Sequence, residues 1–128
     1  MTNVILSSLS ASGVLHLTLN GPEKKNAFNR PMWSAFCDAL NAARENPTVA
    51  CVVISGAGAD FSSGMDLNDF GGEGDTGEHP FYGAQQATIE FDKPLIAAAK
   101  GIAVGGGATL LFHCDMIYVG ESLRMRLP

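Results

Sequence analysis

The stretch KPLIAAAKGIAVGGGATL, residues 93–110, decides the fold class. It contains an apolar run, Leu95 to Ala99, whose length and small aliphatic side chains are typical of a buried strand. Three consecutive glycines follow at 105–107, and the apolar residues from Ala108 to His113 predict a short helix. The segment therefore predicts a strand, a glycine-rich turn and a helix, in that order.

A second segment upstream has the same organisation. Ala50 to Ser55 is a continuous apolar run and predicts a strand buried on both faces. The glycine-rich turn Gly56 to Leu67 follows it, and Asp66 to Phe70 predicts a short helix. Glycine lets a backbone approach a ligand closely, and the first N–H groups of a helix are free to point at it. Two such turns side by side would form an oxyanion hole, although each turn taken alone is also explained by tight packing.

The rest of the chain alternates strands and helices, which predicts an α/β fold. Strands are expected at Val4–Ser10 and Val14–Asn20, paired as a hairpin with one buried face, and at Met116–Val119 and Leu123–Leu127. Helices are expected at Pro31–Asn46, capped by Asn29, and at His79–Asp92, with a mobile surface loop at Gly71–Gly77. Trp33, Phe36 and Phe112 are interpreted as core residues. The last strand stops at Pro128 without a turn, which indicates part of a longer protein.

Composition excludes several classes of protein. The 128 residues are 46% hydrophobic with a net charge of −5, and no Lys or Arg occurs between Glu45 and Asp92, so nucleic acid is not an expected partner. No apolar run is long enough to span a membrane, and the N-terminus resembles no signal peptide, so a cytoplasmic location is expected. The three cysteines, Cys37, Cys51 and Cys114, are interpreted as buried reduced thiols, and no metal-ligand spacing occurs.

Four segments resemble, in order and spacing, the crotonase superfamily, also called the enoyl-CoA hydratase/isomerase family. They are Lys24–Asn29, Phe61–Leu67, Lys93–Gly107 and Cys114–Asp115, and the resemblance runs from about Val14 to Pro128. It implies a crotonase-like spiral of ββα units, of which residues 1–128 would be the N-terminal, acyl-CoA-binding part. The C-terminal helical part, absent here, would make the full-length protein a homo-oligomer, a trimer or hexamer.

The resemblance also implies a site. The N–H groups of Met65 and Gly106 would form the oxyanion hole and hold the oxygen of an acyl-CoA thioester while an enolate forms. Coenzyme A would lie against a set of residues from the first two motifs: Lys25, Asn26, Ala27, Ser63, Gly64, Asp66 and Leu67. No metal and no cofactor is implied, because coenzyme A arrives as part of the substrate.

One departure from the family bears on the reaction. Family hydratases have a glutamate two positions after the glycine triplet, where this chain has Thr109, which cannot act as a carboxylate base. Gly107–Leu111 and Leu123–Pro128 look more like the Δ3,Δ2-enoyl-CoA isomerase branch, whose single glutamate lies shortly after the segment matching Arg126–Pro128. The full-length enzyme is therefore predicted to act on fatty or other acyl-CoA esters as an isomerase rather than a hydratase.

Alternatives remain open at this point. One alternative is a non-catalytic acyl-CoA-binding or assembly protein, and another is a hydratase with an unusual base. Asp66, Asp115 and His113 are candidate bases, but each is more simply explained by a structural role. His79 is interpreted as a solvated residue. A dinucleotide-binding protein is a weak alternative, because the G-x-G-x-x-G spacing is absent.

Overall fold

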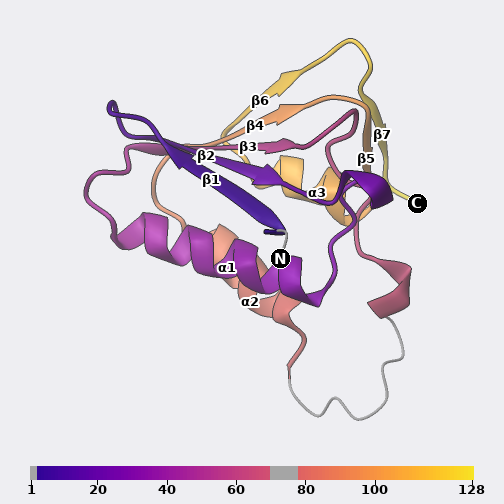
Figure 1. Cartoon of the computed structure of the whole chain (residues 1–128), viewed down its shortest axis with the longest axis horizontal. Helices are drawn as coiled ribbons and strands as arrows, with labels where there is room; N and C mark the ends of the chain where they lie inside the picture. The colour runs from indigo at the N-terminus through magenta and orange to yellow at the C-terminus, as the bar shows by residue number, and fades with distance from the viewer. Residues whose placement is uncertain (1–2, 70–77) are drawn as a thin grey trace.

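A computed structural model describes residues 3–69 and 78–128 and has two sheets (Figure 1). The larger sheet has the strand order β1 (Ile5–Leu9), β2 (Val14–Leu19), β3 (Cys51–Gly56), β4 (Leu95–Ala99) and β6 (Met116–Val119). β1 is antiparallel to β2, whereas β2, β3, β4 and β6 are parallel. The predicted α/β class and hairpin are confirmed. The predicted loop at Gly71–Gly77 lies outside the described residues.

Three helices connect successive parallel strands and cover one face of this sheet (Figure 1). They are α1 (Arg30–Glu45), α2 (Pro80–Glu90) and α3 (Gly106–Phe112). Each returns the chain to the start of the next parallel strand, so all three run in the same direction. The 3₁₀ helices η1 (Pro22–Lys24) and η2 (Leu67–Asp69) lie in the two loops that build the candidate site.

Helix α1 begins and ends where the sequence predicts. The Asn29 side chain accepts a hydrogen bond of 3.0 Å from Met32 N, and Pro31 lies in the first turn, where its missing N–H leaves nothing unpaired. The buried residues of α1 recur every three or four positions: Met32, Trp33, Phe36, Leu40 and Ala43. They pack with Leu17 and Leu19 of β2 in the core between sheet and helices.

Three predictions of burial are wrong. β3 is buried on one face only: Val52 and Ile54 are fully buried, but Val53 is half-exposed on the face without helices. Phe112, predicted in the core, is 61% exposed at the end of α3. The cysteines, predicted buried, are half-buried and free. Apolar runs in a sequence cannot tell which face a neighbouring layer covers.

The glycine-rich stretch 100–109 contains a short strand where the sequence predicts only a turn. β5 (Ile102–Val104) pairs in parallel with β7 (Arg124–Arg126) in a second, two-stranded sheet. β5 has only three residues and pairs with a segment far along the chain, so no local pattern predicts it. β7 falls within the predicted strand Leu123–Leu127.

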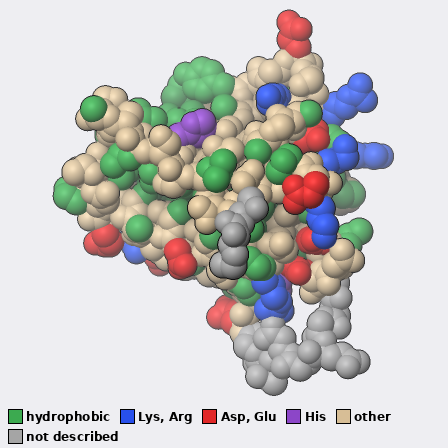
Figure 2. Space-filling model, in the orientation of Figure 1, with side chains coloured by type: hydrophobic (Ala, Val, Ile, Leu, Met, Phe, Trp, Pro, Cys, Tyr) green, Lys and Arg blue, Asp and Glu red, His purple; other side chains and the backbone are tan. Residues whose placement is uncertain are grey.

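Strand β6 exposes an apolar edge. It is the last strand of the larger sheet, and Met116, Ile117, Tyr118 and Val119 are each 42–60% exposed. Figure 2 shows hydrophobic side chains gathered at the top of the molecule, over this strand. An exposed edge strand with apolar side chains is a site for pairing with another chain.

We expect the isolated chain to self-associate through this edge and the Val119→Lys variant to associate less. A charge on the edge strand opposes strand pairing and is costly to bury. Size-exclusion chromatography over a range of concentrations should show a smaller concentration-dependent shift for the variant. Glu121→Lys, in the turn after β6, is the control for added positive charge. An equal effect of both variants would show that charge alone, and not the β6 edge, controls association.

Candidate active site

The two glycine-rich turns lie against each other at the start of α3. Ser62 N donates to Ile102 O at 3.0 Å, and Val104 N donates to Ser62 O at 3.1 Å. Gly64 has φ of +93°, and a Cβ there would lie 2.6 Å from Val104 O, so only glycine fits. A Cβ placed on Gly106 would lie 3.7 Å from Met65 N. The backbone N–H groups of residues 65 and 106 therefore belong to one small region.

Both of these N–H groups lack a backbone partner in the described part of the chain. Phe28 N donates to Gly64 O at 2.7 Å, and Asp66 N donates to Phe28 O at 2.8 Å. In this parallel pairing, the N–H of the residue between them, Met65, points away from Phe28. Gly106 is the first residue of α3, where N–H groups have no partner within the helix. The structure thus brings together the two donors predicted from the sequence.

Asn26 is a buried residue that connects the loop around η1 to the first glycine-rich turn. Its side chain is 0% exposed and accepts from Gly21 N at 2.9 Å while donating to Ala57 O and Asp60 O, both at 2.9 Å. Its φ of 55° is in the left-handed region, which asparagine tolerates better than most residues. The Asn26 side chain therefore has a structural role, and a ligand here would meet backbone rather than this amide.

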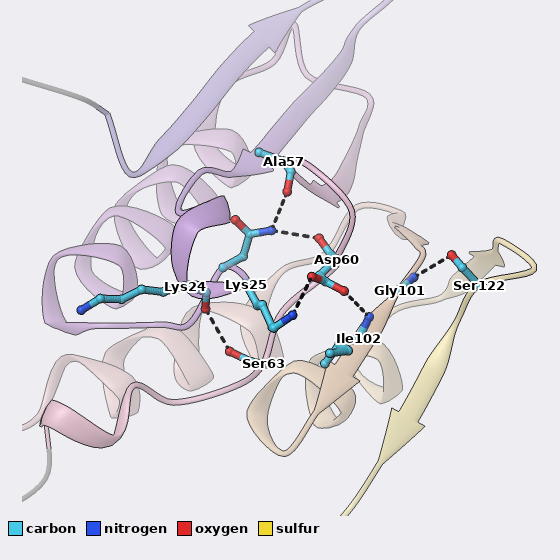
Figure 3. Close-up of polar contacts among 9 residues, drawn as sticks. Lys24, Lys25, Ala57, Asp60, Ser63, Gly101, Ile102 and Ser122 are labelled. Carbon is cyan, nitrogen blue, oxygen red and sulfur yellow. Dashed lines mark hydrogen bonds and ion pairs between the residues drawn. The ribbon is translucent and has the colours of Figure 1, made fainter.

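Asp60 extends the connection to the second turn (Figure 3). Its Oδ1 accepts from Ile102 N at 2.8 Å, and its Oδ2 lies 3.9 Å from Lys25 Nζ. Ser63 Oγ donates to Lys24 O at 3.2 Å, and Ser63 N donates to Lys25 O at 2.9 Å. The position of the loop that bears Lys24 and Lys25 is thus fixed relative to both glycine-rich turns.

Lys25 and Leu67, which are predicted to contact coenzyme A, form an exposed rim around these loops together with Lys24. The side chains of Lys24 and Lys25 are 61% and 59% exposed, and their carboxylate partners are 3.7 and 3.9 Å away. Such exposed pairs contribute little stability, so the ammonium groups are available to an anion. Leu67 is 79% exposed, and Ala27 is half-buried. Lys and Arg side chains gather on the right of the molecule, near η1 and the C-terminus (Figure 2).

A pocket of about 290 Å³ lies beside Gly106, between α1, α2 and α3. Aromatic side chains, including Trp33 and Phe81, form one part of its wall, and polar side chains form another. Trp33 is 4% exposed, and its Nε1 has no hydrogen-bond partner among the described residues. The α2 side of this pocket was not predicted from the sequence, because the apolar positions of α2 indicate only a helix.

The candidate bases other than His113 have structural partners. Asp66 Oδ1 accepts from Asn68 N at 2.9 Å, and Asp115 Oδ2 accepts from Leu95 N at 2.8 Å. Thr109 Oγ1 donates to Gly106 O at 3.1 Å. His79, predicted to be solvated, instead caps α2: it is half-buried, and its Nδ1 accepts from Phe81 N at 3.0 Å. Within the described ranges, no carboxylate lines the pocket.

Cys37 and Cys114 lack the features of nucleophiles. Burial, and next the neighbouring Asp115, raise the pKa of the Cys114 thiol to about 12. Burial, followed by Asp38, also raises the pKa of Cys37. A thiol with a raised pKa is protonated at neutral pH and therefore unreactive.

The described residues contain neither a metal-ligand cluster nor a membrane-spanning helix. In residues 3–69 and 78–128, no group of three or more His, Cys, Asp or Glu side chains is placed to hold a metal ion. No helix in the same ranges has both the length and the apolar character needed to cross a membrane.

The fold and the paired turns show an α/β protein with two backbone N–H donors beside a pocket. Comparison with known proteins identifies its family. The sequence profile of the enoyl-CoA hydratase/isomerase family matches residues 10–128, and the chain belongs to that family. The crystal structure of an enoyl-CoA hydratase/isomerase from Pseudoalteromonas atlantica T6c superposes with a TM-score of 0.91 at 36% identity, covering 98% of this chain and 49% of that one.

Two curated relatives come from Escherichia coli. The 1,2-epoxyphenylacetyl-CoA isomerase is 34% identical over 97% of this chain and 50% of its own length. The 2,3-dehydroadipyl-CoA hydratase is 36% identical over 90% of this chain and 46% of its own length. The chain thus spans about half the length of these relatives, which include both an isomerase and a hydratase.

Proposed function

We propose that this chain is the acyl-CoA-binding half of an enzyme that stabilises a thioester enolate between the N–H groups of Met65 and Gly106. The observation behind this proposal is the meeting of two unpartnered donors at a pocket, with only 3.7 Å between Met65 N and the Cβ position of Gly106. Fixed donors stabilise negative charge as it develops on an oxygen without having to reorganise. Each such donor lowers a barrier by roughly 3 kcal/mol.

The loop around η1 is proposed to hold the coenzyme A part of the substrate. Coenzyme A is a polyanion, and Lys24 and Lys25 provide two exposed ammonium groups beside the site. Ser63 fixes the loop that bears them, through its bonds to the carbonyls of both lysines. A ligand stretched from this rim to Gly106 would place its thioester at the two N–H groups and its acyl group in the pocket.

For the full-length enzyme we propose Δ3,Δ2-enoyl-CoA isomerisation. A base removes a proton from C2, the dienolate forms, and the same proton returns at C4, so one carboxylate suffices. Thr109 supports this choice over hydration with two glutamates, because its position offers no carboxylate. The base is expected in a segment following the one that matches Arg126–Pro128. Neither step needs a metal or redox cofactor, since backbone donors stabilise the enolate.

Binding of the thioester carbonyl can be tested with one ligand pair. Octanoyl-CoA and S-octyl-CoA differ in the carbonyl oxygen, and Trp33, the chain's one tryptophan, lines the pocket and reports binding by fluorescence. We expect octanoyl-CoA to bind roughly tenfold more tightly, because two hydrogen bonds to the oxygen add about 1 kcal/mol or more. The Gly106→Ala variant should lose this difference, because its Cβ would occupy the space in front of Met65 N.

Gly83→Ala is the matched control. A Cβ at Gly83 in α2 meets its nearest atom, Cys37 Sγ, at 3.5 Å, an ordinary contact remote from the two donors. The Gly83→Ala variant should retain the preference for octanoyl-CoA over S-octyl-CoA. Equal affinity of the wild-type chain for both ligands would overturn the proposed oxyanion hole.

A non-catalytic binding function is the second candidate. Within the described ranges no carboxylate lines the pocket, which favours binding without turnover in this chain by itself. Proton NMR of octanoyl-CoA in D₂O distinguishes the two candidates. Exchange of the C2 protons that requires the chain and is lost in Gly106→Ala would exclude the purely binding role.

A further inference from the structure

The pocket is a groove lined by residues of α2 and α3, with Trp33 and Phe36 of α1. On both helices the lining residues recur at spacings of three, one and three, from Phe81 to Thr88 on α2 and from Gly106 to His113 on α3. Residues with these spacings share one face of a helix. The groove therefore has a face of α2 on one side and a face of α3 on the other.

The two helices have their N-terminal ends at the same end of the groove. The Trp33 ring lies close to both N-terminal ends. Its Cη2 atom lies 3.9 Å from the Cβ position of Gly106, and its ring centroid lies 5.0 Å from that of Phe81. Because both helices return the chain between parallel strands, their C-terminal ends, with Thr88 and His113, lie at the far end. At 1.5 Å per residue, that end is about 10 Å from the two proposed donors.

The character of the groove changes along its length. Near Gly106 its wall is aromatic, with Trp33 and Phe81. Farther along, Gln85, Thr88 and His113 add hydrogen-bonding groups. The Gln85 side-chain amide and the His113 imidazole are exposed to solvent at the mouth of the groove, and in the part of the chain that the structure describes they have no protein hydrogen-bond partner. The buried Thr88 hydroxyl donates to Ala84 O at 2.8 Å and can still accept.

A plain hydrocarbon chain is a poor match for this far end. Covering polar groups with hydrocarbon removes their water without supplying a partner, and each unpaired group costs free energy. An oxygen on the ligand at this end of the groove would accept from the Gln85 amide or the His113 ring. Binding sites that hold a hydrogen-bonding group reject analogues that lack it.

We propose, on the basis of the proposed function, that the groove selects acyl groups with a hydrogen-bonding oxygen at the far end over plain acyl chains of equal length. Gln85 and His113 are the specificity-determining residues. The oxygen lies about 10 Å from the thioester, as set by the position of His113 seven residues beyond Gly106. The substrate class is thus an ω-oxygenated medium-chain acyl-CoA ester.

The test compares ω-hydroxyoctanoyl-CoA with octanoyl-CoA by Trp33 fluorescence on the 128-residue chain. We expect the hydroxylated ester to bind about three- to tenfold more tightly, the effect of one net hydrogen bond. Gln85→Leu and His113→Leu should each reduce this ratio, and the double variant should bring it to one or below. Gln86→Leu is the matched control, because Gln86 is adjacent, does not line the pocket and bonds Glu90 at 2.7 Å.

The outcomes separate this inference from the proposed function. Equal binding of the two esters, with the thioester preference over S-octyl-CoA intact, would overturn the inference and leave the proposed function standing. A preference for the hydroxyl that survives the double variant would also overturn it, since other groups would then recognise the oxygen. If neither ester bound, the acyl-CoA-binding function would fail, and the inference with it. Circular dichroism confirms that each variant is folded before it is compared.

Discussion

Replacing Asn26 by alanine is expected to lower the free energy of unfolding by at least about 3 kcal/mol. The substitution leaves Gly21 N, Ala57 O and Asp60 O without their partner in a partly buried place, and each unpaired group costs about 1 kcal/mol. It also puts alanine at a φ of 55°, which alanine disfavours. Urea unfolding followed by circular dichroism measures the loss.

Two further variants assign the cause of this loss. Asn26→Gly permits the left-handed φ but still lacks the amide, so it should be nearly as unstable as Asn26→Ala. Asn20→Ala removes a single hydrogen bond near the surface, to Asn3 O, and should cost about 1 kcal/mol or less. A stable Asn26→Gly protein would show that backbone strain, and not the three hydrogen bonds, explains the effect.

Gly107→Ala is expected to destabilise the chain by about 3 kcal/mol or to prevent folding. A Cβ there would lie 2.3 Å from Ser62 O and 2.9 Å from Ser62 C, distances that require the backbone to move. Ser62 is fully buried and hydrogen-bonded to Asn26 O at 2.8 Å, so it has little freedom to shift. The two glycine-rich turns should then separate, and the two proposed donors with them.

The neighbouring glycine provides the control for this prediction. A Cβ on Gly106 has its nearest neighbour at 3.7 Å, so Gly106→Ala should change stability by less than about 1 kcal/mol while altering ligand binding. Thermal unfolding of both variants compares the two positions directly. Equal stability of the two variants would contradict the close packing of residue 107 on Ser62.

These two positions show what local sequence could not provide. The motif containing Lys25 and Asn26 predicted contact with coenzyme A, but the amide of Asn26 is used inside the protein. Its role depends on Ala57 and Asp60, which are more than 30 residues away, and no periodicity in the sequence links them. The contact of Gly107 with Ser62 is likewise formed by packing between distant segments.

Sequence patterns predicted the structure correctly where the stabilising interactions join residues that are close in the chain. Asn29 and Pro31 fixed the start of α1, because a cap and a first-turn proline act within one helical turn. Alternation in β2 indicated which side chains are buried, because successive side chains of a strand face opposite ways. The same logic failed for Val53 and Phe112, whose exposure depends on which face of the sheet or helix another layer covers.

By itself, the sequence determined the α/β class, most helix and strand positions, the family, and Met65 and Gly106 as candidate donors. These features rest on local conformation and on motifs whose residues are close in the chain. Only the tertiary structure brought the two N–H groups close together beside the pocket, revealed β5 and placed Gln85 and His113 along one groove. The physical reason is that close contact between segments depends on packing and long-range pairing, which no local pattern of residues specifies.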